Sequence, residues 1–431
     1  MTTFDQILPG LARIFQNHHC DLAGIAPILV NRDLNGRVRL IVDKTWRDDA
    51  SARAILKGIA HEIHQEVAPH AYAAESALLF ESDLATLLTN ESTFLLEGCP
   101  NIHVVDRLAV DSDWTRFAPE AKPPRIVFYS IKGGVGRSTA LAATAWTLAE
   151  EGKKVLVLDL DLESPGLSSS LLPEERRPTY GITDWLVEDL VDNGAAVLDD
   201  MVAASTLSRN GDILVVPAHG KEPGEYVAKL GRVWMPKMDQ QGHRDGWAKR
   251  LHRLLDELAR RWSPDVILID SRAGIDEVAS ACITELGASL ILLFAIDGDQ
   301  TWTGYRALFD HWLRTGVAVD IRERLQMVGA MIPEIGHRDY FDSLRERSWD
   351  TFIELYTEVP AGAVAMDGGV WSFDGPDELA PHYPWAVRWH RSFAALRSLH
   401  GRLQDIEPAE VENIFGRLIA GVRLTLGSDV A

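Results

Sequence analysis

Apolar runs and amphipathic stretches alternate along the middle of the chain. The segments Ser138–Glu150, which is rich in Ala, and Trp247–Trp262 are predicted to be helices, and the second carries Leu residues at the three- and four-residue spacing of a helix. The runs between such segments are nearly continuous in Val, Ile and Leu, which is typical of parallel strands that helices cover on both faces. We therefore expect an α/β fold with a doubly wound, mostly parallel sheet, whose ligands bind at the carboxyl ends of the strands. The predicted strands are Arg125–Ser130, Lys154–Asp159, Asp212–Pro217, Asp265–Asp270, Ser289–Ile296 and Leu325–Ile332.

The segments before and after this region carry different patterns. Residues 1–120 combine short apolar runs with a helical stripe over Ala50–Val67, and they predict a small N-terminal α/β domain. Ala118–Arg125 carries three prolines and is predicted to be a stiff linker. We therefore expect three parts: residues 1–120, a central domain at 125–335, and a mostly helical C-terminal extension at 336–431 that packs on the central domain.

Two further stretches have a distinct composition. Gly220–Gly246 is rich in Gly, Lys and Gln, and it is predicted to be an irregular excursion from the central domain. Pro408–Leu426 has an apolar stripe at helical spacing, while its polar face mixes acidic and basic residues. A membrane-surface helix usually has a basic polar face. This helix is therefore expected to pack against its own domain or a partner rather than to tether the chain to a membrane.

Charge and cysteine usage limit the possible environments and partners. The formal net charge of −20 disfavours a general binder of nucleic acid or of anionic membranes. The three cysteines are widely scattered and predict no disulfide framework. The strongest apolar run, Leu290–Ile296, is far shorter than the roughly 20 residues of a membrane span. These features, and a start without the pattern of a signal peptide, predict a cytoplasmic protein with no membrane span.

A glycine-rich loop follows the first predicted strand of the central domain. Ser130–Thr139 reads SIKGGVGRST and leads directly into a predicted helix. A strand, a glycine loop and a helix N-terminus together offer backbone N–H groups to a phosphate chain, and glycine lets the backbone come close to an anion. Ser138 stands where the hydroxyl of such a loop would ligate Mg²⁺.

Acidic residues follow two other predicted strands. Asp159 and Asp161 come at the end of the strand that follows the loop, and Asp270 ends the run VILID. Carboxylates beside a phosphate loop can hold Mg²⁺ through water or orient an attacking water. Aspartate is also common at turns, so each acidic residue alone is weak evidence. All three motifs in this order, each at a strand end, favour a nucleotide site.

These motifs resemble one family of nucleotide-hydrolysing proteins. Lys132–Thr139 resembles the deviant Walker A loop of the ParA/MinD class of P-loop ATPases. Asp159–Leu167 (DLDLESPGL) is similar to the switch I of that class, and Val266–Gly274 (VILIDSRAG) to its Walker B and switch II. The resemblance covers about half of the chain, from Arg125 to Pro333. The motif KGGVGR resembles that of a bacterial branch of this class known as KGGVGR-motif variant ATPases.

The resemblance implies an enzyme that binds ATP and Mg²⁺ and acts as a homodimer with ATP at the interface. In that class, the lysine at the position of Lys132 reaches the phosphates of the partner subunit, and the aspartate at the position of Asp161 orients the attacking water. The implied catalytic residues are thus Lys132, Arg137 and Asp161, and the implied metal residues are Ser138, Asp159 and Asp270. The implied phosphate-binding residues are Gly133, Gly134, Val135, Gly136, Arg137, Ser138 and Thr139.

Two positions depart from the family pattern. Arg137 replaces the usual lysine of the loop. Arginine keeps the charge and can grip a phosphate with two N–H groups, but its planar fork differs from an ammonium in shape. The swap leaves the rate of hydrolysis open. Pro333 stands where the family often has an asparagine that reads adenine, so specificity for adenine follows from the family alone.

The predicted function is a slow, Mg²⁺-dependent ATPase that works as a molecular switch. We expect it to dimerise with ATP and to signal to an unidentified protein partner, with residues 1–120 as a regulatory or partner-binding domain. A role in a bacterial multi-gene system, such as defence against phage, follows only by association with the branch. One alternative is a scaffold that binds nucleotide without hydrolysing it. Another is a DNA-partitioning ATPase, which the net charge of −20 disfavours.

Overall fold

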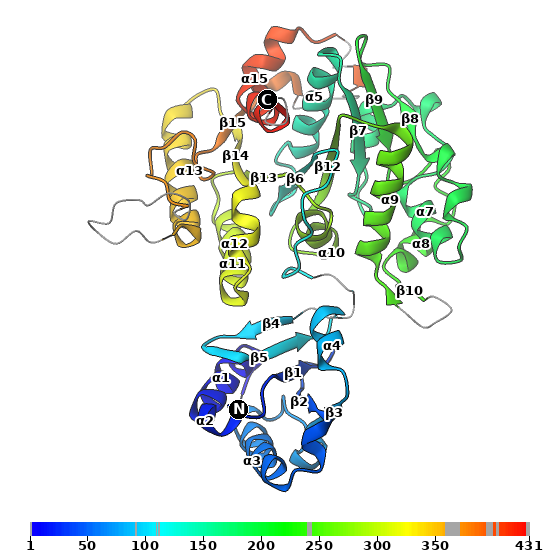
Figure 1. The fold of residues 1–431 in the computed structure, drawn as a ribbon. Coiled ribbons are helices and arrows are strands. Elements are labelled where there is room, and N and C mark those ends of the chain that lie inside the picture. Colours follow the sequence, from blue (N-terminus) through cyan, green and yellow to red (C-terminus); the bar gives the residue numbers. More distant parts are fainter. Residues whose placement is uncertain are drawn as a thin grey trace. The chain divides into compact units, whose positions relative to one another are not determined.

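The apolar runs in the middle of the chain form the strands of one large sheet in a computed structural model of the protein (Figure 1). The structure describes residues 2–90, 93–108, 110, 113–238, 244–357, 371–393, 400–401 and 405–427. The strands of this sheet are β6 (Arg125–Ser130), β7 (Lys154–Asp159), β8 (Ala203–Ala204), β9 (Asp212–Val216), β12 (Val266–Ala273), β13 (Leu290–Ala295), β14 (Leu325–Ile332) and β15 (Trp385–Arg388). Within the described residues they lie in the order β15-β14-β13-β6-β12-β7-β9-β8.

The sheet is mostly parallel, as the sequence predicts. Among the strands that the structure describes in this sheet, only the edge strand β8 runs antiparallel to its neighbour, β9. Strands β6, β7 and β14 begin and end at the predicted residues. The strands β8 and β15 were not predicted; β15 pairs with β14 in parallel, through Val328 and Trp385. The C-terminal part of the chain therefore adds a strand to the sheet as well as helices.

Helices cover both faces of the sheet. The face that carries Ile126, Val157 and Leu268 packs against α5 (Arg137–Glu150), α6 (Leu167–Leu171) and α15 (Pro408–Gly427) in one apolar core. The opposite side carries α9 (Trp247–Trp262), α10 (Glu277–Ser280), α11 (Asp299–Thr315) and α13 (His337–Phe352) (Figure 1). Shorter helices are α7 (Ile182–Asp189), α8 (Tyr226–Val233) and α12 (Ala318–Ile321). This is the doubly wound α/β architecture that the apolar pattern predicts.

The amphipathic helix α15 packs on its own domain. Its predicted apolar stripe is buried and belongs to the core formed with α5 and the sheet. The side chain of Trp385 on β15 lies so close to Gly421 that a Cβ on this glycine would clash with the indole ring. Across the parts of the chain that the structure describes, no helix has the length and apolar content of a membrane-crossing segment. The buried residues of the stripe are Val411, Ile414, Phe415, Leu418, Ile419 and Val422.

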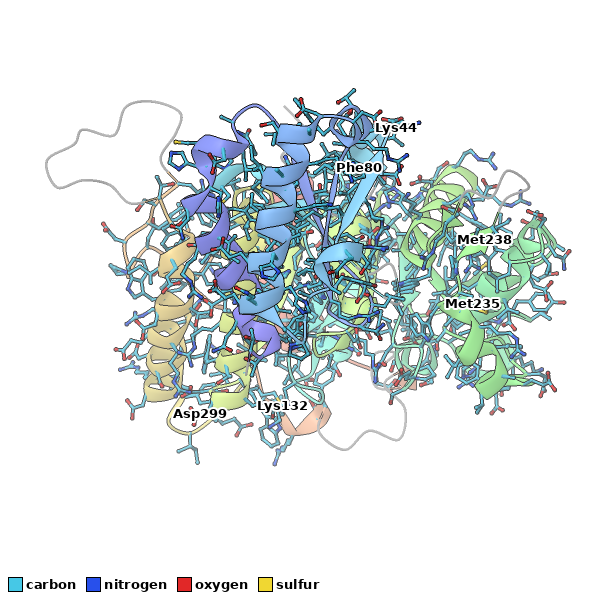
Figure 2. All side chains as sticks on the ribbon, turned by 90° about the horizontal axis from the view of Figure 1, so that it is seen from below. Lys44, Phe80, Lys132, Met235, Met238 and Asp299 are labelled. Atoms are coloured by element: carbon cyan, nitrogen blue, oxygen red, sulfur yellow. The ribbon has the colours of Figure 1, made fainter. Side chains whose placement is uncertain are left out.

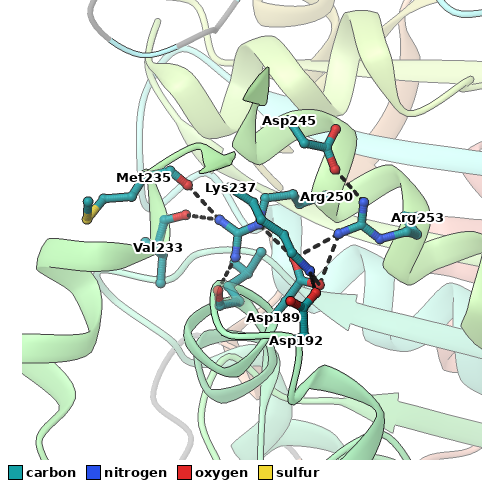
Figure 3. Close-up of polar contacts among 9 residues, drawn as sticks. Asp189, Asp192, Val233, Met235, Lys237, Asp245, Arg250 and Arg253 are labelled. Atoms are coloured by element: carbon teal, nitrogen blue, oxygen red, sulfur yellow. Dashed lines mark hydrogen bonds and ion pairs between the residues drawn. The ribbon is translucent and has the colours of Figure 1, made fainter. Parts of the chain in front are cut away.

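The stretch Gly220–Gly246 is more regular than predicted. Its described residues form α8 and a short antiparallel pair, β10 (Lys237–Met238) and β11 (Arg244–Asp245). Arg250, a buried arginine of α9, holds this segment against α9 because it donates hydrogen bonds to the carbonyl oxygens of Val233 and Met235 (Figure 3). The apolar pattern of the segment did not predict this order, because the arginine that holds the segment lies outside it, in α9.

The same arginine also bonds to α7. Arg250 donates to the Leu186 carbonyl and, at 2.8 Å, from Nε to a carboxylate oxygen of Asp189. Arg253 of the next turn donates to both oxygens of Asp189, at 3.0 and 2.8 Å (Figure 3). Lys237 lies 3.3 Å from the same carboxylate and 2.5 Å from Asp192. We call these five side chains the Arg250 cluster; they tie α7, α9 and β10 together.

Contacts divide the chain into two compact units. One comprises Met1–Ala109 with His311–Ala318, and the other comprises Val110–Asp310 with Val319–Ala431. The proline-rich stretch 118–125 lies within the second unit. There, the backbone N–H of Ala118 donates to Thr284 at 2.8 Å and that of Ala121 donates to Gly287 at 3.0 Å.

The first unit has its own sheet and core. Its strands are β1 (Ile28–Arg32), β2 (Val38–Asp43), β3 (Leu78–Glu81), β4 (Thr93–Leu96) and β5 (Cys99–Asp106), in the order β3-β2-β1-β5-β4. The helices α1 (Ile7–Asn17) and α3 (Ala50–Val67) contribute to one apolar cluster, and α4 (Leu84–Asn90) to another. The short helix α2 (His19–Leu22) follows α1. The helix α3 spans the predicted residues, whereas α1 and β1 were not predicted.

Candidate functional site

The glycine loop joins β6 to α5 at the carboxyl edge of the large sheet. Gly134 and Gly136 have left-handed φ angles of 76° and 81°, which residues with a Cβ rarely adopt. Gly136 is the N-cap of α5, so the first N–H groups of a 14-residue helix point out of the loop. Val135 is buried and anchors the loop, while Gly133 and Gly134 are exposed. This is the geometry in which backbone N–H groups bind a phosphate chain.

Two side chains of the first turn of α5 bond to the end of β12. The hydroxyl of Ser138 donates to Asp270 at 2.6 Å, and Nε of Arg137 donates to the other oxygen of the same carboxylate at 2.7 Å. Arg137 also donates to the hydroxyl of Ser130 at 3.3 Å, and it lies 3.7 Å from Asp161. The structure thus brings Arg137, Ser138, Asp161 and Asp270 together, although they come from three separate motifs.

The two carboxylates at the end of β7 are incompletely bonded. Asp159 is fully buried, and one of its oxygens accepts hydrogen bonds from the N–H and hydroxyl of Ser168. Its other oxygen, and one oxygen of Asp161, are buried with no hydrogen-bond partner among the described residues. Buried polar groups in native proteins are normally bonded, so unpaired oxygens at a strand end indicate a site for a missing ligand.

Burial and mutual repulsion alter the acidity of these groups. Burial, together with the charge of Asp270, raises the pKa of Asp159 to about 7. Burial also raises the pKa of Asp161, although the charge of Arg137 opposes that shift. For Arg137, burial alone would lower the pKa, but the neighbouring carboxylates, Asp270 first, raise it above its ordinary value. The site therefore holds more carboxylates than cations, an arrangement that favours binding of a further cation.

A cavity of about 620 Å³ opens in front of the loop. Its wall includes the loop from Gly133 to Thr139, and also Asp161 and Arg272. The opposite wall comes from the ends of β14 and β15 and from α15; its side chains include Met331, Val387, Trp389, His390, Phe393 and Phe415. The sequence predicted the loop side of this cavity but not the C-terminal side.

The predicted residues Lys132 and Thr139 lie apart from the group formed by Arg137, Ser138, Asp161 and Asp270. Lys132 is exposed (Figure 2), and no described residue accepts a hydrogen bond or ion pair from its ammonium group. Thr139 lines the cavity on the first turn of α5. At the end of β14, the cavity is lined by Met331 rather than by Pro333, within the described residues. Specificity for adenine therefore stays a prediction that follows from the family alone.

The residues present fit a magnesium ion of the P-loop type. No three His, Cys, Asp or Glu side chains form a metal site by themselves within the ranges that the structure describes. P-loop proteins instead hold Mg²⁺ with one hydroxyl, phosphate oxygens and waters that bond to carboxylates. The Ser138 hydroxyl, the Asp270 carboxylate and the unpaired oxygen of Asp159 supply such a partial set.

The family model of the CobQ/CobB/MinD/ParA nucleotide binding domain matches residues 126–361. The chain belongs to this family. The septum site-determining protein MinD of Escherichia coli K12 is 30% identical over 170 residues, which are 39% of this chain and 49% of that protein. A putative arsenical pump-driving ATPase of Aquifex aeolicus is 47% identical over 67 residues, 15% of this chain and 17% of that protein. The chain thus spans about half the length of the MinD relatives it matches.

Solved structures of the CobQ/CobB/MinD/ParA family also resemble the chain. The structure of pNOB8 ParA bound to nonspecific DNA has a TM-score of 0.44 at 18% identity, and covers 71% of this chain and 98% of its own. MinD of Pyrococcus horikoshii complexed with Mg-ADP has a TM-score of 0.42 at 19% identity, over 69% of this chain and 95% of its own. The family match at residues 126–361 identifies the glycine loop as part of a nucleotide-binding domain.

Proposed function

We propose that the protein is an Mg²⁺-dependent ATPase that hydrolyses ATP slowly and works as a molecular switch. The observation that carries this proposal is the convergence of Ser138 and Arg137 on Asp270 at the N-terminus of α5. A phosphate chain in the glycine loop would lie between these groups and the unpaired oxygens of Asp159 and Asp161.

Each of these residues has a role that its geometry supports. The Ser138 hydroxyl would ligate Mg²⁺, and Asp270 and Asp159 would accept hydrogen bonds from waters of the metal. When bound, Mg²⁺ neutralises the charge on the β- and γ-phosphates. Asp161, whose side chain is 21% exposed, would accept a hydrogen bond from the attacking water and orient it.

Arg137 supports the proposal of slow turnover. Its side chain is buried and bonds to Asp270 and Ser130, so it must exchange these partners before it can bind a phosphate. A lysine in this place has a single ammonium group that can turn more freely. The same contacts favour a second candidate function, a scaffold that binds nucleotide without hydrolysing it.

We also propose that ATP controls assembly. Lys132 is exposed beside the loop, and its charge is not matched by a described residue of its own chain. Across a homodimer it would contact the phosphates held by the partner subunit. The first unit would then serve as a regulatory or protein-binding module, in agreement with a role inside a multi-gene system. Nonspecific DNA binding, which the pNOB8 ParA structure shows for that protein, is disfavoured here by the net charge of −20.

Phosphate release and sedimentation test these proposals on the purified chain. We expect slow phosphate release that requires Mg²⁺, and a shift from monomer to dimer with ATP but not with ADP. Asp270→Asn should lower turnover at least about a hundredfold, since removal of one group that stabilises the transition state commonly costs that much. Lys132→Ala should remain monomeric with ATP.

Controls separate the candidates. Asp199→Asn removes an exposed aspartate that pairs with Arg261 on the surface, and should leave turnover and assembly unchanged. Tight ATP binding without phosphate release would establish the scaffold instead of the enzyme. A wild-type chain that stays monomeric with ATP and Mg²⁺ would contradict the dimer. Retention on DNA with ATP at low salt would favour partitioning.

A further inference from the structure

Arg272 lies at the same edge of the sheet as the glycine loop, but the proposed function gives it no role in binding or hydrolysing ATP. It stands near the end of β12, where the pairing with β6 shifts register between Asp270 and Ala273. After this shift, the N–H of Gly274 donates to the carbonyl of Ser130 at 2.9 Å, directly before the loop. The side chain of Arg272 lines the phosphate cavity, together with Ser138 and Asp161.

The guanidinium of Arg272 links two loops that surround the site. It lies 2.6 Å from the carboxylate of Glu163, in the segment after β7, and 3.1 Å from that of Asp276, in the segment after β12. Glu163 lies in the segment that resembles switch I, and Arg272 itself lies in the segment that resembles Walker B and switch II, whereas Asp276 follows two residues after that segment. Arg272 therefore bridges the segment after β7 and the segment after β12.

The exposure of this bridge differs from that of Arg137. The side chains of Arg272 and Glu163 are 32% and 47% exposed, whereas Arg137 is 8% exposed and bonds to the 1% exposed Asp270. An exposed ion pair contributes little free energy, so Glu163 can return to water at small cost. A phosphate group binds an arginine fork through two parallel charge-assisted hydrogen bonds, which are stronger than an exposed pair.

We propose that Arg272 senses the terminal phosphate of a bound nucleoside triphosphate. In this exchange, Arg272 leaves Glu163 and donates to the terminal phosphate. Asp276, which is 18% exposed, keeps its ion pair with Arg272. The link between the two loops is then replaced by a link through the nucleotide. A nucleoside diphosphate lacks the phosphate that Arg272 would bind, so the ion pair between Arg272 and Glu163 remains. This inference rests on the proposed function and extends it to the discrimination between ATP and ADP.

Affinities for the two nucleotides test the inference without a need for turnover. Titration calorimetry with Mg²⁺ would give the dissociation constants of ADP and of a non-hydrolysable ATP analogue for the full chain. For Arg272→Gln we expect at least about tenfold weaker binding of the triphosphate analogue, the usual cost of a lost charged hydrogen bond, with ADP changed less than about twofold. Arg272→Lys should lie between, because an ammonium keeps the charge but loses the fork.

A variant of Glu163, the residue that Arg272 would leave, tests the same exchange of partners. Glu163→Gln removes the competing carboxylate and leaves Arg272 in place, so the triphosphate analogue should bind about threefold tighter or better, with ADP unchanged. Arg260→Gln removes a comparable surface pair with Glu257 on α9 and should change neither affinity. Equal losses for both nucleotides in Arg272→Gln, or no effect of Glu163→Gln, would overturn the sensor role. A wild-type chain that binds neither nucleotide would instead overturn the proposed function, and this inference with it.

Discussion

The second unit contains two clusters that each centre on a buried arginine and a buried aspartate, and the two clusters have opposite properties. In the Arg250 cluster, a fully buried arginine donates to Asp189 and to three backbone carbonyls, and Asp189 also accepts from Arg253 (Figure 3). At the glycine loop, Arg137 bonds to Asp270 and lies 3.7 Å from Asp161, but Asp159 and Asp161 each keep a buried oxygen with no partner among the described residues. At the centre of each, a buried arginine bonds to a buried aspartate: Arg250 to Asp189 in one and Arg137 to Asp270 in the other.

The pKa shifts of the aspartates show what the difference means. Burial alone would raise the pKa of Asp189, but its bonds to Arg250 and Arg253 outweigh burial and lower it below the ordinary value. Burial raises the pKa of Asp159 to about 7 because no cation compensates it directly. The first cluster is complete within the chain and stabilises the fold. The second keeps carboxylate oxygens without a hydrogen-bond partner among the described residues, which is the feature expected of a binding site rather than of a structural contact.

Arg250→Met should have the largest effect on stability. It leaves the carboxylate of Asp189 buried with less compensation and three carbonyl groups without a donor. Removal of one partner from a buried ion pair costs about 3–5 kcal/mol. Urea denaturation followed by tryptophan fluorescence would measure the loss of unfolding free energy.

Arg253→Met is the matched control for that variant. Arg253 bonds to the same Asp189, but its side chain is 46% exposed, so we expect a loss of about 1 kcal/mol. The folded fraction of both variants should bind nucleotide as the wild type does. If Arg250→Met were as stable as the wild type, or if it altered nucleotide affinity, the division into a structural and a functional cluster would be wrong.

Asp159→Asn should have the next largest effect, and its size should depend on pH. The pKa of Asp159 is about 7 in the folded chain, against an ordinary value of 3.8, so the folded chain binds the proton more tightly than the unfolded chain. This group therefore stabilises the fold below pH 4 and loses that contribution as the pH rises to about 7. Without nucleotide, the neutral variant should melt several degrees above the wild type at pH 8.

The difference should shrink towards pH 5, where Asp159 of the wild type is protonated as well. Thermal melts at several pH values, without nucleotide or Mg²⁺, would measure it. Asp189→Asn offers the opposite case: the pKa of Asp189 is lowered, so this variant should be less stable than the wild type at pH 8. A pH-independent difference for Asp159→Asn would show that the carboxylate is compensated in the folded chain.

The sequence predicted the loop side of the site because each motif lies at the end of a long apolar strand. Continuous runs such as Val155–Leu158 leave few alternatives to a buried parallel strand, and the strand ends then bring Ser138, Asp161 and Asp270 together. The short strand β15 was missed, because its four residues are held by β14 and α15 rather than by a local pattern. The cavity wall formed by Trp389 and Phe393 was missed for the same reason.

Arg272 shows a different limit. It lies inside a motif that the sequence revealed, but its neighbours do not indicate a role. Its partner Glu163 belongs to another motif, and only the parallel order of β7, β12 and β6 places the two side chains together. Likewise, Arg250 reads as a polar interruption of an amphipathic helix until its backbone acceptors in another segment are known. Contacts between distant segments are where the apolar pattern carries least information.

Asp192→Asn should have the smallest effect, at the rim of the Arg250 cluster. Asp192 lies 2.5 Å from Lys237, but its side chain is 85% exposed, and water screens this pair. Its backbone also has a left-handed φ of 62°, a conformation that asparagine adopts at least as readily as aspartate. We therefore expect urea denaturation to show a change within about 0.5 kcal/mol. A loss of unfolding free energy close to that of Arg250→Met would mean that the Arg250 cluster depends on its exposed charges as much as on its buried ones. The difference between this cluster and the glycine loop would then come from net charge rather than from complete hydrogen bonding.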